Sequence, residues 1–376
     1  MKQAETLSIA IIAGTRPEII KVAPVYLACK AEKLWNTTLI LTGQHRDLVN
    51  PFLDVFGITP ELDLELRHTN SQVGEILGKM IAALTVELSK LRPNLVLVQG
   101  DTSSALAGAL AAFYLKIPVG HIEAGLRTND FSSPFPEEMN RVLISKIAIL
   151  HFAPTKRALD NLKSEGISRS LYLTGNTGVD ALLLVKNNLP KYKLGPEVEK
   201  LLARNEKFIL TTFHRRENQE DFFPQFLELI SLVSQKTGIK IVIPVHLSPN
   251  VSDTIRSRFS NQENILLLPP VDYPSLIALM SRCEVIISDS GGIQEEAPSL
   301  DKHIFIARTS TERPEVIESG YGELLDLRSP TDGAQRIVEF LSSARTVHTS
   351  PNPFGDGTAS AQIVKAIVEY WRQAYQ

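Results

Sequence analysis

The stretch Val285-Ile286-Ile287-Ser288-Asp289-Ser290-Gly291-Gly292-Ile293-Gln294-Glu295-Glu296 passes from a short apolar run through a turn into a helical pattern. The apolar run is typical of a buried parallel strand, and the glycines let an anion approach the backbone closely. A helix that begins after such a turn directs unpaired N–H groups and the positive end of its dipole at one spot. The sequence therefore predicts a phosphate-binding unit at Ser290, Gly291 and Gly292.

Two further side chains extend this unit toward a nucleotide site. Glu296 is expected one helical turn after Gly292, where its carboxylate can accept hydrogen bonds from a ribose diol. Arg313 belongs to a second polar loop, residues 308–315, that is rich in anion-binding groups. A plain strand–turn–helix joint without a ligand is the alternative. The second loop favours a nucleotide diphosphate site.

Length and composition narrow the choice of protein class. A chain of 376 residues is too long for one ordinary core and predicts two domains. With 43% hydrophobic and 22% charged residues it is typical of a globular protein. A net charge of -3 argues against nucleic acid or an anionic membrane as the main partner. The apolar run 9–13 is too short for a signal segment or a membrane span, so we expect a cytoplasmic protein.

Strand-like and helix-like segments alternate along the chain. This pattern predicts an α/β fold with two doubly wound, Rossmann-like domains that face a cleft. The expected strands are 8–14, 37–43, 94–100, 118–124 and 171–175 in the first half, and 208–212, 240–245, 265–268, 285–287 and 303–307 in the second.

A polar segment with helix breakers, 190–207, separates the two halves and is expected to be a linker. The predicted domains are therefore 1–190, which carries the acid/base residues, and 207–358, which carries the nucleotide site. An amphipathic helix follows at 359–376.

Acidic side chains follow predicted strands of the first domain. Asp101 stands in Gly100-Asp101-Thr102, Glu123 two residues after His121, and Glu137 in a loop that is rich in proline. Each acid alone could simply cap a helix, which is a common role for aspartate. Three acids at successive crossover ends are harder to explain as surface charge, so they favour acid/base catalysis.

Basic side chains are expected at the same cleft. Arg16 and Lys21 open the first helix, directly after the first strand. His214 ends the first strand of the second domain, where it can donate to a phosphate or shuttle a proton, and Arg215 follows it. His246 ends the next strand and is as readily structural as functional. The dinucleotide fingerprint Gly-x-Gly-x-x-Gly is missing, which argues against a tightly bound NAD.

Taken together and in order, these motifs resemble the non-hydrolysing UDP-N-acetylglucosamine 2-epimerases. The resemblance covers essentially the whole chain. The motifs that carry it are Gly14-Thr-Arg-Pro-Glu18, Gln44-His45-Arg46, Gly100-Asp101-Thr102, His121-Ile-Glu-Ala-Gly-Leu-Arg-Thr128, Pro136-Glu-Glu138, Gly175-Asn-Thr177, His214-Arg-Arg-Glu-Asn218, Asp289-Ser-Gly-Gly-Ile-Gln-Glu-Glu296 and Thr311-Glu-Arg-Pro-Glu315.

The resemblance implies a glycosyltransferase-B-like fold, in which the C-terminal helix crosses back to the first domain. It implies a UDP-N-acetylhexosamine as the small-molecule partner, a homodimer, and neither a cofactor nor a metal. The hexosamine would face Asp101, Glu123 and Glu137, with His214 beside them. The implied nucleotide and diphosphate contacts are Arg16, Lys21, His214, Ser290, Gly291, Gly292, Glu296 and Arg313.

Relatives in bacteria carry a second, regulatory UDP-N-acetylglucosamine site, which the resemblance implies here too. Its expected residues are Gln44, His45, Arg46, Arg215 and His246. The sequence departs from the family pattern at Asp47, which is shorter than the usual residue, at Phe213, and at Gln219-Glu220-Asp221. The last two departures flank the expected pyrophosphate position and bear on sugar preference.

The mechanism that fits these residues is elimination of UDP across C1–C2 to a glycal, followed by its return. Inversion requires two acid/base groups on opposite faces of C2; Asp101 is one, and either Glu123 or Glu137 is the other. Alternatives remain open: an epimerase of a 6-deoxy or uronic acid UDP-sugar, a UDP-sugar-dependent glycosyltransferase, a hydrolysing epimerase, or a UDP-sugar-binding regulator.

Overall fold

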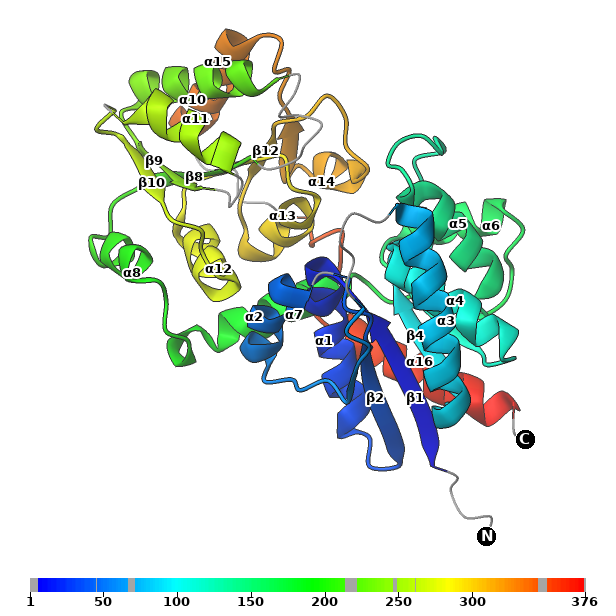
Figure 1. Cartoon of the computed structure of the whole chain (residues 1–376). Helices are drawn as coiled ribbons and strands as arrows, with labels where there is room; N and C mark the ends of the chain where they lie inside the picture. Colours follow the sequence, from blue (N-terminus) through cyan, green and yellow to red (C-terminus); the bar gives the residue numbers. More distant parts are fainter. Residues whose placement is uncertain are drawn as a thin grey trace. The chain divides into compact units, whose positions relative to one another are not determined.

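The chain folds into two compact units. The computed structural model describes residues 6–44, 46–66, 72–213, 222–245, 249–260, 262–343 and 350–374. The first unit comprises Met1–Leu184 together with Phe354–Gln376, and the second comprises Val185–Pro353. Each unit contains one parallel sheet with helices between its strands (Figure 1).

The first unit contains a seven-stranded sheet of order β3-β2-β1-β4-β5-β6-β7 in which neighbouring strands run parallel. The strands are β1 (Leu7–Ala13), β2 (Trp35–Leu41), β3 (Leu62–Asp63), β4 (Leu95–Gln99), β5 (Val119–Ile122), β6 (Leu150–Ala153) and β7 (Leu171–Leu173). The connecting helices are α1 (Arg16–Ala31), α2 (Arg46–Phe56), α3 (Val73–Leu91), α4 (Ser103–Tyr114), α5 (Glu137–Ile147) and α6 (Lys156–Ser164). Helix α7 (Thr177–Asn187) follows β7 and contains the boundary between the two units, after Leu184.

The second unit repeats this winding in a six-stranded sheet of order β10-β9-β8-β11-β12-β13, again parallel. Its strands are β8 (Phe208–Thr212), β9 (Lys240–Pro244), β10 (Ile265–Leu268), β11 (Ile286–Ser288), β12 (Ile304–Ile306) and β13 (Gly322–Leu324). Its helices are α8 (Pro196–Ala203), α10 (Phe223–Thr237), α11 (Pro249–Phe259), α12 (Tyr273–Arg282), α13 (Gly291–Glu296), α14 (Pro314–Glu318) and α15 (Pro330–Ser342), with 3-10 turns at Leu189–Lys191 and Ala297–Leu300.

Helices cover parallel strands on both faces, so the strands read as continuous apolar runs rather than alternating ones. All five residues of β4 and all five of β8 are buried. The winding direction of each sheet reverses between two central strands, β1 and β4 in the first unit and β8 and β11 in the second. Ligands of doubly wound sheets bind beyond the strand ends at such switch points. These findings confirm the predicted fold class of two doubly wound parallel sheets.

The C-terminal helix α16 (Ala359–Ala374) belongs to the first unit, where it packs beside α1 (Figure 1). The carboxylate of Asp180 accepts hydrogen bonds from the N–H groups of Ala359 (3.2 Å) and Ser360 (2.8 Å). These are donors that no helical carbonyl satisfies, so Asp180 fixes the start of α16.

The segment 190–207, expected as a linker, instead belongs to the second unit and contains α8. Helix α8 packs against α12, and the N–H of Gly195 donates to Ser275 Oγ at 3.0 Å. Pro196 occupies the first helical position, where a missing N–H costs nothing, so this breaker marks a helix start. Among the described residues no helix is long and apolar enough to cross a membrane.

Candidate active site

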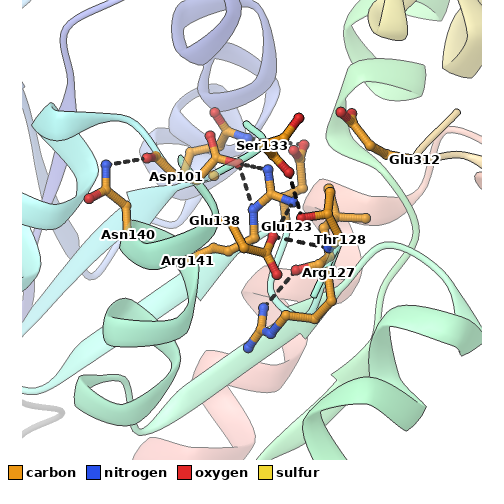
Figure 2. A network of polar contacts seen from close by, with 12 residues as sticks. Asp101, Glu123, Arg127, Thr128, Ser133, Glu138, Asn140, Arg141 and Glu312 are labelled. Atoms are coloured by element: carbon orange, nitrogen blue, oxygen red, sulfur yellow. Dashed lines mark hydrogen bonds and ion pairs between the residues drawn. The ribbon is translucent and has the colours of Figure 1, made fainter. Parts of the chain in front are cut away.

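Asp101 lies two residues after the end of β4 and contacts an arginine from α5. Arg141 donates from Nε (2.9 Å) and from Nη2 (2.5 Å) to the same oxygen, Oδ2. The amide of Asn140 also donates to the backbone carbonyl of Asp101 at 2.8 Å. Figure 2 shows both contacts reaching Asp101 from α5. The carboxylate of Asp101 is therefore held in one orientation at the switch point of the sheet.

Arg141 is itself held in place by Glu138, the second glutamate of the motif Pro136-Glu-Glu138. Glu138 is 1% exposed and contacts Arg141 Nη1 at 3.1 Å. Its carboxylate also accepts the N–H group of Thr128 at 3.0 Å (Figure 2) and that of Asn129 at 3.0 Å. Three donors satisfy this buried charge, so Glu138 has a structural role. Glu137, the predicted acid, begins α5 and is only half-buried.

Glu123 follows β5, next to the strand that carries Asp101. Its carboxylate forms an ion pair with Lys21 from α1 and accepts from Gln99 Nε2 at 3.0 Å. Its backbone has φ +67°, which a residue with a side chain rarely adopts and which often marks functional sites. A Cβ placed on Gly100 would lie 3.9 Å from Glu123 Oε1, so this carboxylate borders the turn before Asp101.

A buried histidine supports the same turn. His121 Nε2 bonds the carbonyl of Gly100 at 2.7 Å. Burial is the leading cause that lowers the pKa of His121 to about 3, so the ring is neutral near pH 7 and Nε2–H donates to the carbonyl. His121 is therefore a buried, neutral support of the turn before Asp101.

Glu18 is the most enclosed acid of this region, with no exposed surface. Its Oε2 accepts from the N–H groups of Gly14 (3.0 Å) and Thr15 (2.8 Å) and from Thr15 Oγ1 (2.8 Å), while Oε1 accepts from Thr102 Oγ1 at 2.7 Å. Burial, opposed by these donors, raises the pKa of Glu18 to about 7.

The loop after β1 is packed too tightly for any side chain at Gly14. A Cβ there would stand 2.1 Å from both Ser104 Oγ and Thr42 Oγ1. Ser104 Oγ also donates to Gln44 Oε1 at 2.7 Å, which places this predicted regulatory residue against the start of α4. Arg16 is exposed at the start of α1, and its guanidinium lies 5.9 Å from the ring centre of Phe52.

In the second unit, the predicted phosphate turn follows β11. Ser290 caps the short helix α13, and its Oγ accepts from the N–H of Ile293 at 3.4 Å. Arg313 lies directly over this turn, because a Cβ on Gly291 would come within 2.8 Å of its Cζ. The guanidinium is held by Glu295 at 2.6 Å and Glu312 at 2.8 Å. The absence of a side chain at Gly291 thus allows Arg313 to reach the turn.

Glu296 ends α13 and is buried, with 7% of its surface exposed. The hydroxyl of Tyr273 donates to Glu296 Oε1 at 2.8 Å. Burial, together with the charge of Glu296, raises the pKa of Tyr273 well above its ordinary value, so the phenol keeps its proton. Tyr273 therefore orients the carboxylate that the sequence predicts as the ribose acceptor.

His45, His214, Arg215 and His246 lie outside the described residues, and of Arg46 only the backbone, in α2, is described. In the described part of the chain, no group of three or more His, Cys, Asp or Glu residues could hold a metal ion.

Sequence reasoning missed the residues that hold the predicted ones in place: Glu18, Gln99, Arg141, Tyr273 and Glu295. Two of them do stand inside quoted motifs, Glu18 in Gly14-Thr-Arg-Pro-Glu18 and Glu295 in the glutamate pair that ends at Glu296. Arg141 is three residues after Glu138, a helical spacing that could have linked it to the acids.

The first Rossmann-like unit holds two acids beside its switch point, each in an ion pair with a basic side chain. The second holds an arginine over a Ser-Gly-Gly turn. This combination is typical of α/β enzymes that act on nucleotide-linked substrates. The family model for UDP-N-acetylglucosamine 2-epimerase matches residues 27–368. The chain therefore belongs to the UDP-N-acetylglucosamine 2-epimerase family and is an isomerase.

Individual relatives agree with this family over nearly their whole length. The UDP-N-acetylglucosamine 2-epimerase of Salmonella typhimurium is 39% identical, over 97% of this chain and 99% of its own. The Campylobacter jejuni enzyme of the same name is 38% identical, over 96% and 97%. The structure of the Neisseria meningitidis UDP-GlcNAc 2-epimerase bound to UDP-GlcNAc superposes with a TM-score of 0.88 at 38% identity, covering 96% of this chain and 100% of that one.

Proposed function

We propose that this chain interconverts UDP-N-acetylglucosamine and UDP-N-acetylmannosamine by inverting C2, without a cofactor. One observation in a member of this family carries the proposal: two acids lie beside the switch point of the first sheet, and each forms an ion pair with a basic side chain. Asp101 pairs with Arg141, and Glu123 pairs with Lys21. Relatives that match nearly the whole chain bear this activity in their names, and one was solved with UDP-GlcNAc bound.

The chemistry follows from the position of the proton that must move. C2 of the sugar is not next to a carbonyl, so its proton is not acidic enough for direct removal. Elimination solves this problem: a carboxylate takes the C2 proton, a C1–C2 double bond forms, and the C1–O bond breaks as UDP leaves with the electron pair. An acid then protonates the other face of C2, and a UDP oxygen attacks C1. Atoms and charge balance without an external oxidant or reductant.

We assign the proton transfers to the first unit. Asp101 acts on one face of C2, and Glu123 or Glu137 acts on the other. Arg141 and Lys21 hold two of these carboxylates at fixed positions, which favours a geometry in which the acid and base are already oriented. His214 is proposed to assist the departing diphosphate.

We assign UDP binding mainly to the second unit. Arg313 offers a planar set of donors that suits phosphate oxygens, and it lies against the turn of Ser290, Gly291 and Gly292. Glu296, oriented by Tyr273, is proposed to accept hydrogen bonds from the ribose hydroxyls. Arg16 is proposed to complete the diphosphate contacts.

Incubation with UDP-N-acetylglucosamine alone tests this function, with products followed by chromatography and proton NMR. We expect UDP-N-acetylmannosamine to accumulate as the minor species with no acceptor and no added cofactor. Stoichiometric UDP and free sugar would indicate a hydrolysing epimerase. An unchanged substrate would point to a glycosyltransferase or a binding protein, and turnover only of a 6-deoxy or uronic acid analogue would change the substrate.

Replacement of Arg313 by alanine tests the UDP assignment. Loss of a charged hydrogen bond costs roughly 1.5–3 kcal/mol, so we expect UDP affinity to fall about 10- to 150-fold in calorimetry. Arg336→Ala is the matched control, because Arg336 also pairs with two glutamates but is 53% exposed on α15. Equal UDP affinity in the Arg313→Ala variant and the wild type would remove Arg313 from the nucleotide site.

Three further assignments remain proposals. A second UDP-N-acetylglucosamine molecule is proposed to bind at Gln44, His45, Arg46, Arg215 and His246. It would act as a regulator by favouring a closed conformation of the enzyme over an open one. Because such coupling is reciprocal, this ligand and the substrate would strengthen each other's binding. A homodimer and a cytoplasmic location are also proposed. Sedimentation of the purified chain would test whether it is a dimer.

A further inference from the structure

Glu18 joins two loops that carry predicted site residues on adjacent strands. Strands β1 and β4 pair side by side at the switch point of the first sheet. One carboxylate oxygen of Glu18 binds the loop after β1, at Gly14 and Thr15, and the other binds Thr102 after β4. Arg16, a proposed diphosphate contact, directly follows Thr15 in the first of these loops.

A local helix cap would need only part of this arrangement. In a capping box the glutamate at the third helical position returns to the backbone of the cap residue, and Glu18 does so with Thr15. The additional bond to Thr102 connects residues 84 positions apart in the chain. Thr102 in turn caps α4 by accepting from the N–H of Ala105 at 3.0 Å, so Glu18 sets the hydroxyl that begins this helix.

We propose that Glu18 is a positioning residue of the epimerase reaction: it clamps the loop of Arg16 to the loop of Asp101, and through Thr102 it sets the place of the Asp101 carboxylate. This inference rests on the proposed function. Because Glu18 has no exposed surface, it acts through its neighbours and does not touch the sugar. The groups that the structure shows bonded to Glu18 are two backbone amides and two hydroxyls, from Gly14, Thr15 and Thr102.

The clamp needs acceptors on both carboxylate oxygens. Glu18→Gln keeps the size of the side chain but turns one of the two acceptors into a donor. An NH2 group cannot accept from the N–H groups of Gly14 and Thr15, and facing Thr102 it would reverse the bond to the hydroxyl that caps α4. Misplacement of a reacting group by about 1 Å can cost roughly 10²-fold in rate. We therefore expect the turnover number for epimerisation to fall by about that factor.

The test measures turnover, UDP affinity and melting temperature at pH 8 for the wild type, Glu18→Gln and Glu61→Gln. Glu61 is the matched control in the same unit: its carboxylate accepts from the N–H of Leu39 (2.7 Å) and from the hydroxyl of Tyr26 (2.9 Å), yet its side chain is 34% exposed. We expect Glu61→Gln to keep full turnover and Glu18→Gln to lose less UDP affinity than turnover, because Arg16 is only one of several proposed UDP contacts.

Melting temperature separates positioning from a merely structural role. An acid whose folded pKa is raised, here to about 7 from 4.5, stabilises the fold below the lower value and loses that effect as pH rises through the higher one. At pH 8 the unfavourable burial of this charge offsets the hydrogen bond that Glu18→Gln loses, so the variant should melt close to the wild type while turning over more slowly.

Three outcomes would overturn the inference. Full turnover in Glu18→Gln would show that the clamp is dispensable. A fall in melting temperature, together with turnover that recovers at a lower assay temperature, would make Glu18 a structural residue. Equal losses in Glu61→Gln would assign the effect to general loosening of the unit. An inactive wild type would instead contradict the proposed function, which is a distinguishable result.

Discussion

In the Asp101→Asn variant, we expect the epimerisation rate to fall about 10²–10⁴-fold, the usual contribution of a positioned acid or base. The amide has nearly the same shape and can still accept from Arg141, but it cannot take a proton. Arg141 is not left as an orphaned charge, because Glu138 contacts it at 3.1 Å. The rate should therefore fall without a large loss of stability.

The measurement compares turnover, UDP affinity and melting temperature with those of the wild type. Asp130→Asn serves as the control, since Asp130 is an exposed aspartate of the same unit whose carboxylate accepts from the N–H (2.9 Å) and the hydroxyl (2.5 Å) of Ser132. UDP affinity should hardly change, because we assign UDP binding mainly to the other unit. Loss of UDP affinity in Asp101→Asn would reassign this residue to ligand binding.

The second large effect is expected for Glu123→Gln, again a rate loss of about 10²–10⁴-fold. Glutamine still accepts from Lys21 and has the same length, so the change removes chiefly the ability to exchange a proton. The backbone of residue 123 has φ +67°, and replacing glutamate by glutamine should leave this strained conformation unchanged.

Glu87→Gln is the matched control for Glu123→Gln. Glu87 also pairs with a lysine, Lys90 at 2.6 Å, but on the surface of α3. If Glu123→Gln turned over at the wild-type rate, the second acid would be Glu137, and a Glu137→Gln variant would then carry the loss instead.

Sequence reasoning located most of the strands because buried parallel strands are uninterrupted apolar runs. It missed β6, because Leu150 follows the apolar pattern of α5 without a glycine or proline between them. It also missed β3, which has only two residues, and β13, which begins at Gly322. Short strands of this kind are defined by pairing with a neighbour and carry little pattern of their own.

The sequence predicted those site residues whose place follows from their position shortly after a strand. Asp101 and Glu123 follow strands, so the fold rule for strand ends identified them. Their partners Arg141 and Lys21 come from helices 40 and 102 positions away, and only the packed structure reveals which acid each one meets. The buried role of Glu18 likewise depends on Thr102, which is brought close by the pairing of β1 with β4.

In the proposed reaction, the C2 proton leaves and is replaced from solvent while UDP is eliminated and returned. Proton NMR of UDP-N-acetylglucosamine incubated with the enzyme in heavy water tests this most directly. We expect both the epimer and the recovered substrate to gain deuterium at C2, with no added cofactor. Epimerisation with the original proton retained at C2 would contradict the proposed reaction.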